Sequence, residues 1–341
     1  MKIAQVAPLF ERVPPKAYGG TERVIYNLTE ALVKAGHEVT LFASGDSITN
    51  ARLVSAVAAS IRPGPGDMSW LAYHTIQMDL VSESAHTFDF IHFHTDYLHF
   101  PLARKLPTPH VTTLHGRQDL PELALVYNHF SDMPLVSISN SQRAPLPYAN
   151  WIETVYHGLP ADACSFCPAP SDYFAFVGRI SREKRLDRAI EIAERCGAQL
   201  IVAAKIDKVD EDYFNECMKS LFRKPHVTYV GEVGEKEKME VLEHARALLF
   251  PIDWPEPFGL VMIEALSCGT PVIAYQNGSI PEIIEDGVTG FVVTNQDEAV
   301  RAAMQIDTIN RKACRAAFER RFTATAMANS YLDVYRRLLS R

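Results

Sequence analysis

Short runs of apolar residues alternate with longer stretches of helical periodicity along almost the whole chain. The runs are rich in β-branched and aromatic residues and are bounded by glycine, proline and polar residues, which predicts strands. They are apolar throughout rather than alternating, so each strand is expected to be buried on both faces. Strands of this kind, separated by helices, form parallel sheets with helices on both sides. The chain is therefore predicted to be a doubly wound α/β protein.

The strand–helix pattern occurs in both halves of the chain. Strands are expected at 2–7, 38–42, 90–93, 110–114 and 135–138, and again at 173–177, 199–203, 227–230, 247–250 and 271–274. Helices are expected at 21–35, 184–196, 210–221, 235–245, 259–267, 296–305, 310–318 and 323–339. The first helix ends just before Gly36, which is the usual position of a C-terminal glycine.

Two domains are expected, because 341 residues exceed the size at which a single core keeps growing. The stretch 157–170 contains three prolines and little periodicity, so it is the best boundary. We predict one Rossmann-like domain over 1–165 and a second over 166–319, with a helix over about 320–341 packing back on the first. Ligands of such sheets bind outside the carboxyl ends of the strands. A cleft across which the two domains face each other is the expected site.

The charge of the chain argues against nucleic acid as a partner. The net charge is −7, and the first 165 residues carry 11 basic and 15 acidic side chains. Neither half has the basic excess that binding to phosphate backbones requires, and contact with an anionic membrane gains no support. The opening residues 1–8 are too short for a signal peptide, and no apolar run is long enough to span a bilayer. The cytoplasm is the expected location.

Six cysteines are scattered at 164, 167, 196, 217, 268 and 314, and only Cys164 and Cys167 have a suggestive spacing. A tetrahedral zinc site would need a second pair, and none completes it. A redox motif would need a helix to start after the pair, where Pro168 stands instead. Free thiols near the domain boundary are the favoured interpretation.

Two glutamates, Glu256 and Glu264, flank the sequence Phe-Gly-Leu at 258–260. Pro255 and Pro257 hold the first glutamate on extended backbone just ahead of an expected helix. The free N–H groups at a helix start attract an anion, and glycine lets a phosphate approach closely. Acceptors on both sides of a phosphate site suit a sugar nucleotide. Taken alone, however, the pair is better explained as a capping carboxylate and a solvated helix glutamate.

Other groups suited to phosphate follow the first strand of each domain. In the second domain Gly178 relieves a bend, while Arg179 and Lys184 offer a bidentate guanidinium and a mobile ammonium. The alternative for these two cations is a solvated basic face. In the first domain Gly19 and Gly20 open the first helix and would let a phosphate approach the backbone.

His115 ends the fourth expected strand, and His92 and His94 end the strand before it. A lone histidine is more often a satisfied structural residue. The carboxyl end of a strand in an α/β domain nevertheless favours a functional role, because ligands bind at that edge.

Together these motifs resemble the retaining glycosyltransferases of the two-domain GT-B fold, family 4. The resemblance covers nearly the whole chain, and its specific part is Glu256-x7-Glu264 with Phe258-Gly259-Leu260 inside it. Val177-Gly178-Arg179 and Lys184 precede this signature in the typical order, and the sequence PEIIEDGVTGFVV at 281–293 follows it.

The resemblance implies a hexosyltransferase that takes its sugar from a UDP-, GDP- or ADP-sugar. Arg179 and Lys184 would bind the donor diphosphate and stabilise the departing nucleotide. Glu256 would bond hydroxyls of the donor sugar, assisted by the backbone N–H groups of 258–260. Glu264 would bind the ribose.

The resemblance also implies roles in the first domain. Gly19 and Gly20 would approach the phosphate, and His115 would lie beside the reacting sugar. One departure from the family is His157-Gly158, which stands where an asparagine–glycine pair is usual. No role is assigned to His157 on that basis.

Family members retain the anomeric configuration, and none of these residues is an obvious nucleophile. Front-face attack is the expected chemistry, with catalysis resting on positioning and on stabilisation of the leaving diphosphate. Asp210 and Asp212 begin an expected helix, where capping is the better interpretation than metal binding. No metal and no cofactor are expected.

Several alternatives stay open. A GT-B-fold sugar-nucleotide epimerase or phosphorylase would bind a similar donor, and so would a sugar-nucleotide-binding protein without turnover. A nicotinamide-dependent dehydrogenase is disfavoured, because no G-x-G-x-x-G follows the first strand. The sequence leaves open the base and sugar of the donor and the oligomeric state. It also leaves open whether the acceptor is a lipid-linked sugar, a polysaccharide or a small metabolite.

Overall fold

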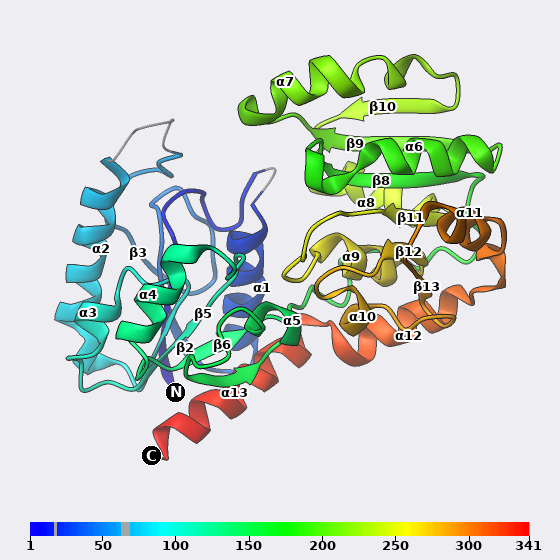
Figure 1. Ribbon diagram of the computed structural model, residues 1–341. Helices are drawn as coiled ribbons and strands as arrows, with labels where there is room; N and C mark the ends of the chain where they lie inside the picture. Colours follow the sequence, from blue (N-terminus) through cyan, green and yellow to red (C-terminus); the bar gives the residue numbers. More distant parts are fainter. Residues whose placement is uncertain (17–18, 63–68, 341) are drawn as a thin grey trace. The chain divides into compact units, whose positions relative to one another are not determined.

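The computed structural model describes residues 1–16, 19–62 and 69–340, and the chain divides into two compact units (Figure 1). Unit 1 comprises Met1–Pro160 together with Ala324–Arg341, and unit 2 comprises Ala161–Thr323. Each unit is a parallel sheet flanked by helices, which confirms the predicted two-domain α/β architecture.

Unit 1 has the strand order β3-β2-β1-β4-β5-β6-β7 within the described residues, and the order reverses between β1 and β4. Its strands are β1 (Lys2–Val6), β2 (Glu38–Phe42), β3 (Arg52–Val54), β4 (Phe90–Phe93), β5 (His110–Thr113), β6 (Leu135–Ser137) and β7 (Trp151–Thr154). Its helices are α1 (Gly20–Lys34), α2 (Ser69–Ser84), α3 (Phe100–Ala103), α4 (Pro121–His129), α5 (Asn140–Arg143) and α13 (Ala324–Leu339). Ligands of such sheets bind beside the reversal, at the carboxyl ends of the strands.

The C-terminal helix α13 belongs to unit 1. Tyr335 of α13 is fully buried and stacks on Phe90 of β4, with ring centroids 4.5 Å apart. The amide of Ala324, which opens the helix, donates to the carbonyl of Leu159 at 2.6 Å. The last segment of the chain therefore completes the core of the first unit.

Unit 2 repeats the plan, with the order β10-β9-β8-β11-β12-β13 among its described strands and a reversal between β8 and β11. The strands are β8 (Tyr173–Arg179), β9 (Gln199–Lys205), β10 (Val227–Gly231), β11 (Ala247–Phe250), β12 (Val272–Tyr275) and β13 (Gly290–Val293). The helices are α6 (Leu186–Arg195), α7 (Glu211–Tyr213), α8 (Glu235–His244), α9 (Leu260–Cys268), α10 (Ile280–Ile283), α11 (Gln296–Met304) and α12 (Arg311–Arg321).

Some elements differ from the sequence-based expectation. The strands β3, β7 and β13 were not predicted. None of the residues of β3 and β7 is buried, so these two strands lack the continuous apolar run of a central strand. The predicted helix 210–221 is interrupted, because α7 is followed by a π-helical turn and then a 3₁₀ turn. Within the described ranges, no helix is both long enough and apolar enough to cross a membrane.

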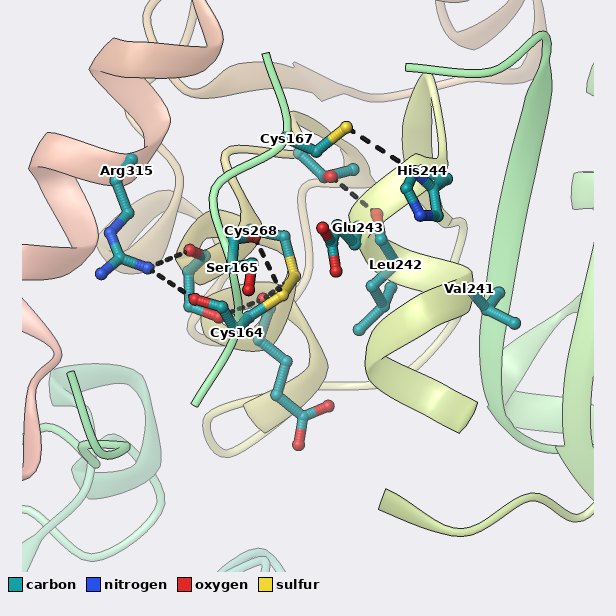
Figure 2. Close-up of a disulfide and its surroundings, with 12 residues drawn as sticks. Cys164, Ser165, Cys167, Val241, Leu242, Glu243, His244, Cys268 and Arg315 are labelled. Atoms are coloured by element: carbon teal, nitrogen blue, oxygen red, sulfur yellow. Dashed lines mark hydrogen bonds between the residues drawn. A yellow bond between two sulfur atoms is a disulfide. The ribbon is translucent and has the colours of Figure 1, made fainter. Parts of the chain in front are cut away.

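The boundary between the units lies a few residues from the predicted position. Residues 161–165 belong to unit 2, because Cys164 forms a disulfide with Cys268 at the end of α9 (Figure 2). Their Cα atoms are 5.4 Å apart. Arg315 of α12 also donates to the carbonyls of Ala161 and Cys164. The interpretation of Cys164 as a free thiol is therefore wrong; its partner lies 104 positions away, where no spacing rule points.

The free-thiol interpretation is confirmed for Cys167, the other cysteine of the pair. Cys167 is a buried free thiol, with its Sγ 3.6 Å from Nδ1 of His244 (Figure 2). At the other boundary, α12 continues to Arg321, so residues 320–323 stay with unit 2 instead of opening the final helix.

The disulfide is expected to stabilise unit 2 mainly by lowering the conformational entropy of the unfolded chain. A cross-link that closes a loop of about 100 residues is worth up to about 4.7 kcal/mol in the chain-entropy treatment. We expect Cys164→Ser to lower the free energy of unfolding of unit 2 by about 2–5 kcal/mol. Denaturant unfolding followed by hydrogen exchange would resolve the two units. The matched control is Cys217→Ser, which removes an exposed free thiol; equal losses in both variants would contradict the assignment.

Candidate functional site

The loop after β8 carries two of the expected cations. Gly178 and Arg179 end β8, and Lys184 lies in the 3₁₀ turn Arg182–Lys184 just before α6. The helix predicted to begin at Lys184 therefore begins two residues later. This leaves Lys184 on a turn at the carboxyl edge of the sheet, where ligands of such sheets bind.

Carboxylates surround the guanidinium of Arg179. One of its nitrogens donates to Glu183 at 2.5 Å, and its Nε lies 3.4 Å from Asp210. Asp207 is 3.8 Å away. Asp210 makes no capping hydrogen bond, so its predicted role as a helix cap is wrong: the side chain turns to Arg179 instead. Burial raises the pKa of Asp210, although Arg179 opposes that rise.

Lys184 is ion-paired with Glu256 across the sheet edge. The ammonium donates to Oε2 of Glu256, which also accepts from Nε1 of Trp254 at 3.0 Å. The ammonium lies 5.2 Å from the ring centre of Phe250 and 5.3 Å from that of Trp254. Glu256 is only 8% exposed. A buried carboxylate requires such a partner, so this pair fixes the loop after β11 against the loop after β8.

Helix α9 begins directly after this loop. Gly259 is its N-cap and has φ of 81°, a left-handed conformation that favours glycine. A second glycine, Gly278, packs against the same loop with φ of 59°, and a Cβ there would overlap the backbone of Glu256. Ser279 then bonds this segment twice, from its amide to the Glu256 carbonyl and from its hydroxyl to the Phe258 carbonyl, each at 2.9 Å. The start of α9 is therefore held in place by Gly278 and Ser279, which lie outside the motif that runs from Glu256 to Glu264.

Glu264 lies inside unit 2 and not on a solvated helix face. It is 4% exposed, and its Oε1 accepts from the ammonium of Lys238 on α8 at 2.6 Å. Lys238 also lies 3.0 Å from Glu235. The interpretation of Glu264 as a solvated helix residue, which competed with ribose binding, is therefore excluded by its burial and its partner.

In unit 1 the expected glycines lie at the start of α1. Gly19 precedes the helix and Gly20 is its first residue. A Cβ on Gly19 would lie 2.7 Å from Cβ of Pro15, so any other residue at this position would have to displace the Pro15 ring. Glu22 follows in the first turn of the helix, and burial raises its pKa to about 7. This carboxyl was not singled out from the sequence, because burial in the first turn of a helix leaves no local pattern.

His115 follows β5, and its ring lies against those of the buried histidines His94 and His157. Its Nε2 lies 2.8 Å from Nδ1 of His94, and its ring stacks on that of His157 with centroids 5.3 Å apart. Burial lowers the pKa of His115 to about 3 and the pKa values of His94 and His157 well below the usual range. Gln142 bonds the carbonyls on either side, those of Leu114 and Gly116. His115 is therefore a neutral, firmly placed ring.

The expected site residues thus fall into two groups, one in each unit. Unit 2 joins Lys184 directly to Glu256, and Gly259 stands beside Glu256, since a Cβ there would lie 3.4 Å from its Cγ. Arg179 and Glu264 each have their own charged partners. Four residues that sequence reasoning missed also support the group: Trp254, Lys238, Gly278 and Ser279. Among the residues that the structure describes, no cluster of three His, Cys, Asp or Glu side chains could hold a metal ion.

Two known protein families match the chain. The one described as Glycosyl transferases group 1 matches residues 167–320, and the one described as Glycosyltransferase Family 4 matches residues 18–164. The first match contains the signature around α9, and the second contains both unit-1 glycines and His115. The two matches together span nearly the whole chain, so the chain is identified as a glycosyltransferase and the resemblance to that class inferred from the motifs is confirmed. Retention of the anomeric configuration stays a prediction.

Three relatives of known sequence or structure are similar to this chain. An uncharacterized 41.2 kDa protein in the cps region of Klebsiella pneumoniae is 33% identical over 170 residues, 47% of this chain and 45% of that protein. The glycogen synthase of Mycobacterium tuberculosis is 25% identical over 391 residues, 95% of this chain and 93% of that one. The structure of Anabaena HepE in complex with UDP and glucose covers 99% of this chain and all of its own, with 19% identity and a TM-score of 0.76. That likeness shows a shared GT-B fold.

The packing of Gly278 makes a specific prediction. Gly278→Ala should displace the Glu256 loop, whereas Gly287→Ala, at φ of 73° with open space around it, should only add backbone strain of about 1–2 kcal/mol. Hydrogen exchange of residues 252–258 should accelerate in the first variant and stay unchanged in the second. The same exchange rates in both variants would show that Gly278 does not hold the loop.

The buried histidines predict acid sensitivity of unit 1. The pKa is lowered, chiefly by burial, for seven histidines of this unit: His74, His92, His94, His99, His110, His115 and His157. The unfolded chain binds these protons near pH 6.5, so the stability present above that pH is lost as the pH falls below it, by about 1.4 kcal/mol per pH unit and proton. Glu22 and Asp96, whose pKa values burial raises to about 7 and about 6, act in the opposite direction but are fewer.

The measurement is hydrogen exchange of both units at neutral and mildly acidic pH, corrected for the intrinsic exchange rates. Unit 1 should lose more protection than unit 2, whose histidines His226 and His244 are partly exposed. Equal losses in the two units would contradict this account.

Proposed function

We propose that this chain transfers a sugar from a nucleotide-sugar donor to an organic acceptor, with retention of the anomeric configuration and without a metal ion. The proposal rests on one arrangement at the start of α9. A cation, Lys184, and a carboxylate, Glu256, lie in contact beside the glycine that opens the helix. A positive helix end with a mobile ammonium suits a diphosphate, and the adjoining carboxylate suits sugar hydroxyls.

The cations of the site bind the phosphates of the donor, and the carboxylate binds its sugar. Arg179 and Lys184 bind the diphosphate and stabilise the negative charge that develops on it as the bond to the sugar breaks. The N–H groups of Gly259 and Leu260 complete this anion site. Glu256 exchanges its bond to Lys184 for bonds to sugar hydroxyls when the phosphate draws the ammonium away.

The remaining positions hold the rest of the donor and the reacting sugar. Glu264 accepts from the ribose hydroxyls, and the bond from Lys238 orients its carboxylate. In unit 1, Gly19 and Gly20 approach the phosphate, and His115 contacts a sugar hydroxyl or the acceptor.

The chemistry is a front-face displacement. The bond between the anomeric carbon and the leaving phosphate oxygen breaks, and the acceptor oxygen bonds to that carbon on the same face. The acceptor proton passes to the departing diphosphate. Such a step depends on orientation and on electrostatic stabilisation and requires no covalent intermediate on the protein. UDP-glucose is the first donor to test, because HepE has been solved with UDP and glucose.

Loss of either cation should reduce transfer without unfolding the chain. Removing one preorganised charged donor costs about two to three orders of magnitude in rate, so we expect this loss in Arg179→Ala and in Lys184→Ala. The matched control is Lys236→Ala, which removes a strongly exposed lysine of α8 and should leave the rate unchanged. Initial rates of nucleoside diphosphate release, with UDP-, GDP- and ADP-glucose and a panel of acceptors, provide the measurement. Near-normal rates in either cation variant would contradict the proposed role.

The same assay separates the alternatives. A glycosyltransferase releases nucleoside diphosphate at a rate that rises with acceptor, and added chelator leaves that rate unchanged if no metal takes part. An epimerase interconverts the donor and releases none. A phosphorylase requires inorganic phosphate. Retention is read from the anomeric coupling constant of the glycoside product, compared with that of the donor.

A further inference from the structure

A continuous chain of buried polar side chains connects helix α13 to His115 within unit 1. Gln5 of β1 lies at its centre: Nε2 of this amide donates to the Tyr335 hydroxyl at 3.1 Å, and Oε1 accepts from Nε2 of His94 at 2.8 Å. Nδ1 of His94 then lies 2.8 Å from Nε2 of His115. Gln5 and Tyr335 are fully buried and His94 nearly so. Water therefore does not replace these partners.

The direction of each hydrogen bond follows from the one before it. An amide has one donor group and one acceptor, so a side chain that donates to Tyr335 must accept from His94. A neutral histidine carries a single ring proton; with that proton on Nε2, Nδ1 of His94 is an acceptor. His115 must then donate from Nε2. Its Nδ1 is left as a bare acceptor.

The hydrogen-bond network ends at Nδ1 of His115. Among the described residues Nδ1 of His115 has no hydrogen-bond partner, although it is buried. A buried acceptor of this kind is normally satisfied, so an unpaired one marks a position for a ligand donor. Burial also keeps the pKa values of His94 and His115 well below neutral, so neither ring holds a second proton that would break the sequence of bonds.

We propose that the Tyr335 hydroxyl fixes which ring nitrogen of His115 carries the proton, so that Nδ1 is presented as an acceptor to a hydroxyl of the substrate. Tyr335 is a positioning residue: it touches no substrate and acts through Gln5 and His94. The role of His115 toward a sugar hydroxyl rests on the proposed function. The tautomer itself does not.

A second branch of the network supplies the control. The Tyr335 hydroxyl also bonds Nδ1 of His92 at 2.7 Å, and Nε2 of His92 bonds the Thr113 hydroxyl at 2.7 Å. Thr113 in turn bonds the hydroxyl of Tyr331 at 2.9 Å. Tyr331 lies one turn before Tyr335 on α13 and is as fully buried, but its hydroxyl is not on the path to His115.

The experiment compares Tyr335→Phe with Tyr331→Phe in the full-length protein without substrate. Two-bond proton–nitrogen correlation spectra of ¹⁵N-histidine-labelled protein distinguish the two ring tautomers, and the His115 signal is assigned by its absence in His115→Asn. In the native protein and in Tyr331→Phe we expect the Nε2–H tautomer alone. In Tyr335→Phe the Gln5 amide loses its acceptor and can flip, so that its nitrogen donates to Nε2 of His94. The proton of His94 then lies on Nδ1 and is donated to Nε2 of His115, so the Nδ1–H tautomer of His115 should appear.

Two outcomes would overturn the proposal. One is the Nδ1–H tautomer in the native protein, and the other is an unchanged tautomer in Tyr335→Phe. Thermal unfolding of both variants shows whether either has lost its fold; if Tyr335→Phe is unfolded, Gln5→Leu breaks the same path and gives the same test. Transfer rates add a separate readout: Tyr335→Phe should lower kcat about two- to tenfold relative to Tyr331→Phe, the effect of one neutral hydrogen bond. A changed tautomer with an unchanged rate would uphold the path and reject the role of His115 in transfer.

Discussion

The ion pair between Lys184 and Glu256 is the interaction on which the candidate donor site depends. A carboxylate as buried as Glu256 is unfavourable without a cation, and removing one partner of such a pair typically costs about 3–5 kcal/mol. The pair therefore fixes the loop after β8 to the loop after β11, on either side of the point where the strand order reverses. A diphosphate can take over the ammonium, and sugar hydroxyls can take over the carboxylate. The same pair would then serve first as a structural bond and later as two binding groups.

Contacts at both ends of helix α9 fix its position, so the groups at its start are already in place for a ligand. At its start, Gly259 adopts a left-handed conformation and the segment of Gly278 holds the preceding loop. At its end, Cys268 is bonded to Cys164, which ties the helix to the segment that enters unit 2. Along its length, Glu264 is held by Lys238 of α8. Functional groups on a helix whose neighbours are fixed by such contacts keep their positions without a ligand. Electrostatic stabilisation of a transition state requires groups that are placed in advance in this way.

The sequence predicted the fold class and family because these depend on local signals: continuous apolar runs, helical periodicity, and the spacing of Glu256, Glu264 and Lys184. It did not predict the partners of those residues. Lys238, Gly278 and Cys268 have no local signature, because the groups that they contact lie distant in the sequence. Asp210 was assigned to a cap by position, whereas a guanidinium brought in by another loop decides its environment. The histidine network likewise joins β1, β4, β5 and α13, and only the folded sheet reveals which ring nitrogen lacks a partner.

The most direct test of the central claim is a crystal structure of the protein with UDP, or with whichever of UDP, GDP and ADP binds most tightly. The account predicts the diphosphate at the start of α9, with its oxygens in hydrogen-bond distance of the N–H groups of Gly259 or Leu260 and of the Lys184 ammonium. It predicts the ribose hydroxyls on the carboxylate of Glu264, with the bond from Lys238 preserved. A nucleotide bound elsewhere, or a ribose with no contact to Glu264, would contradict the account.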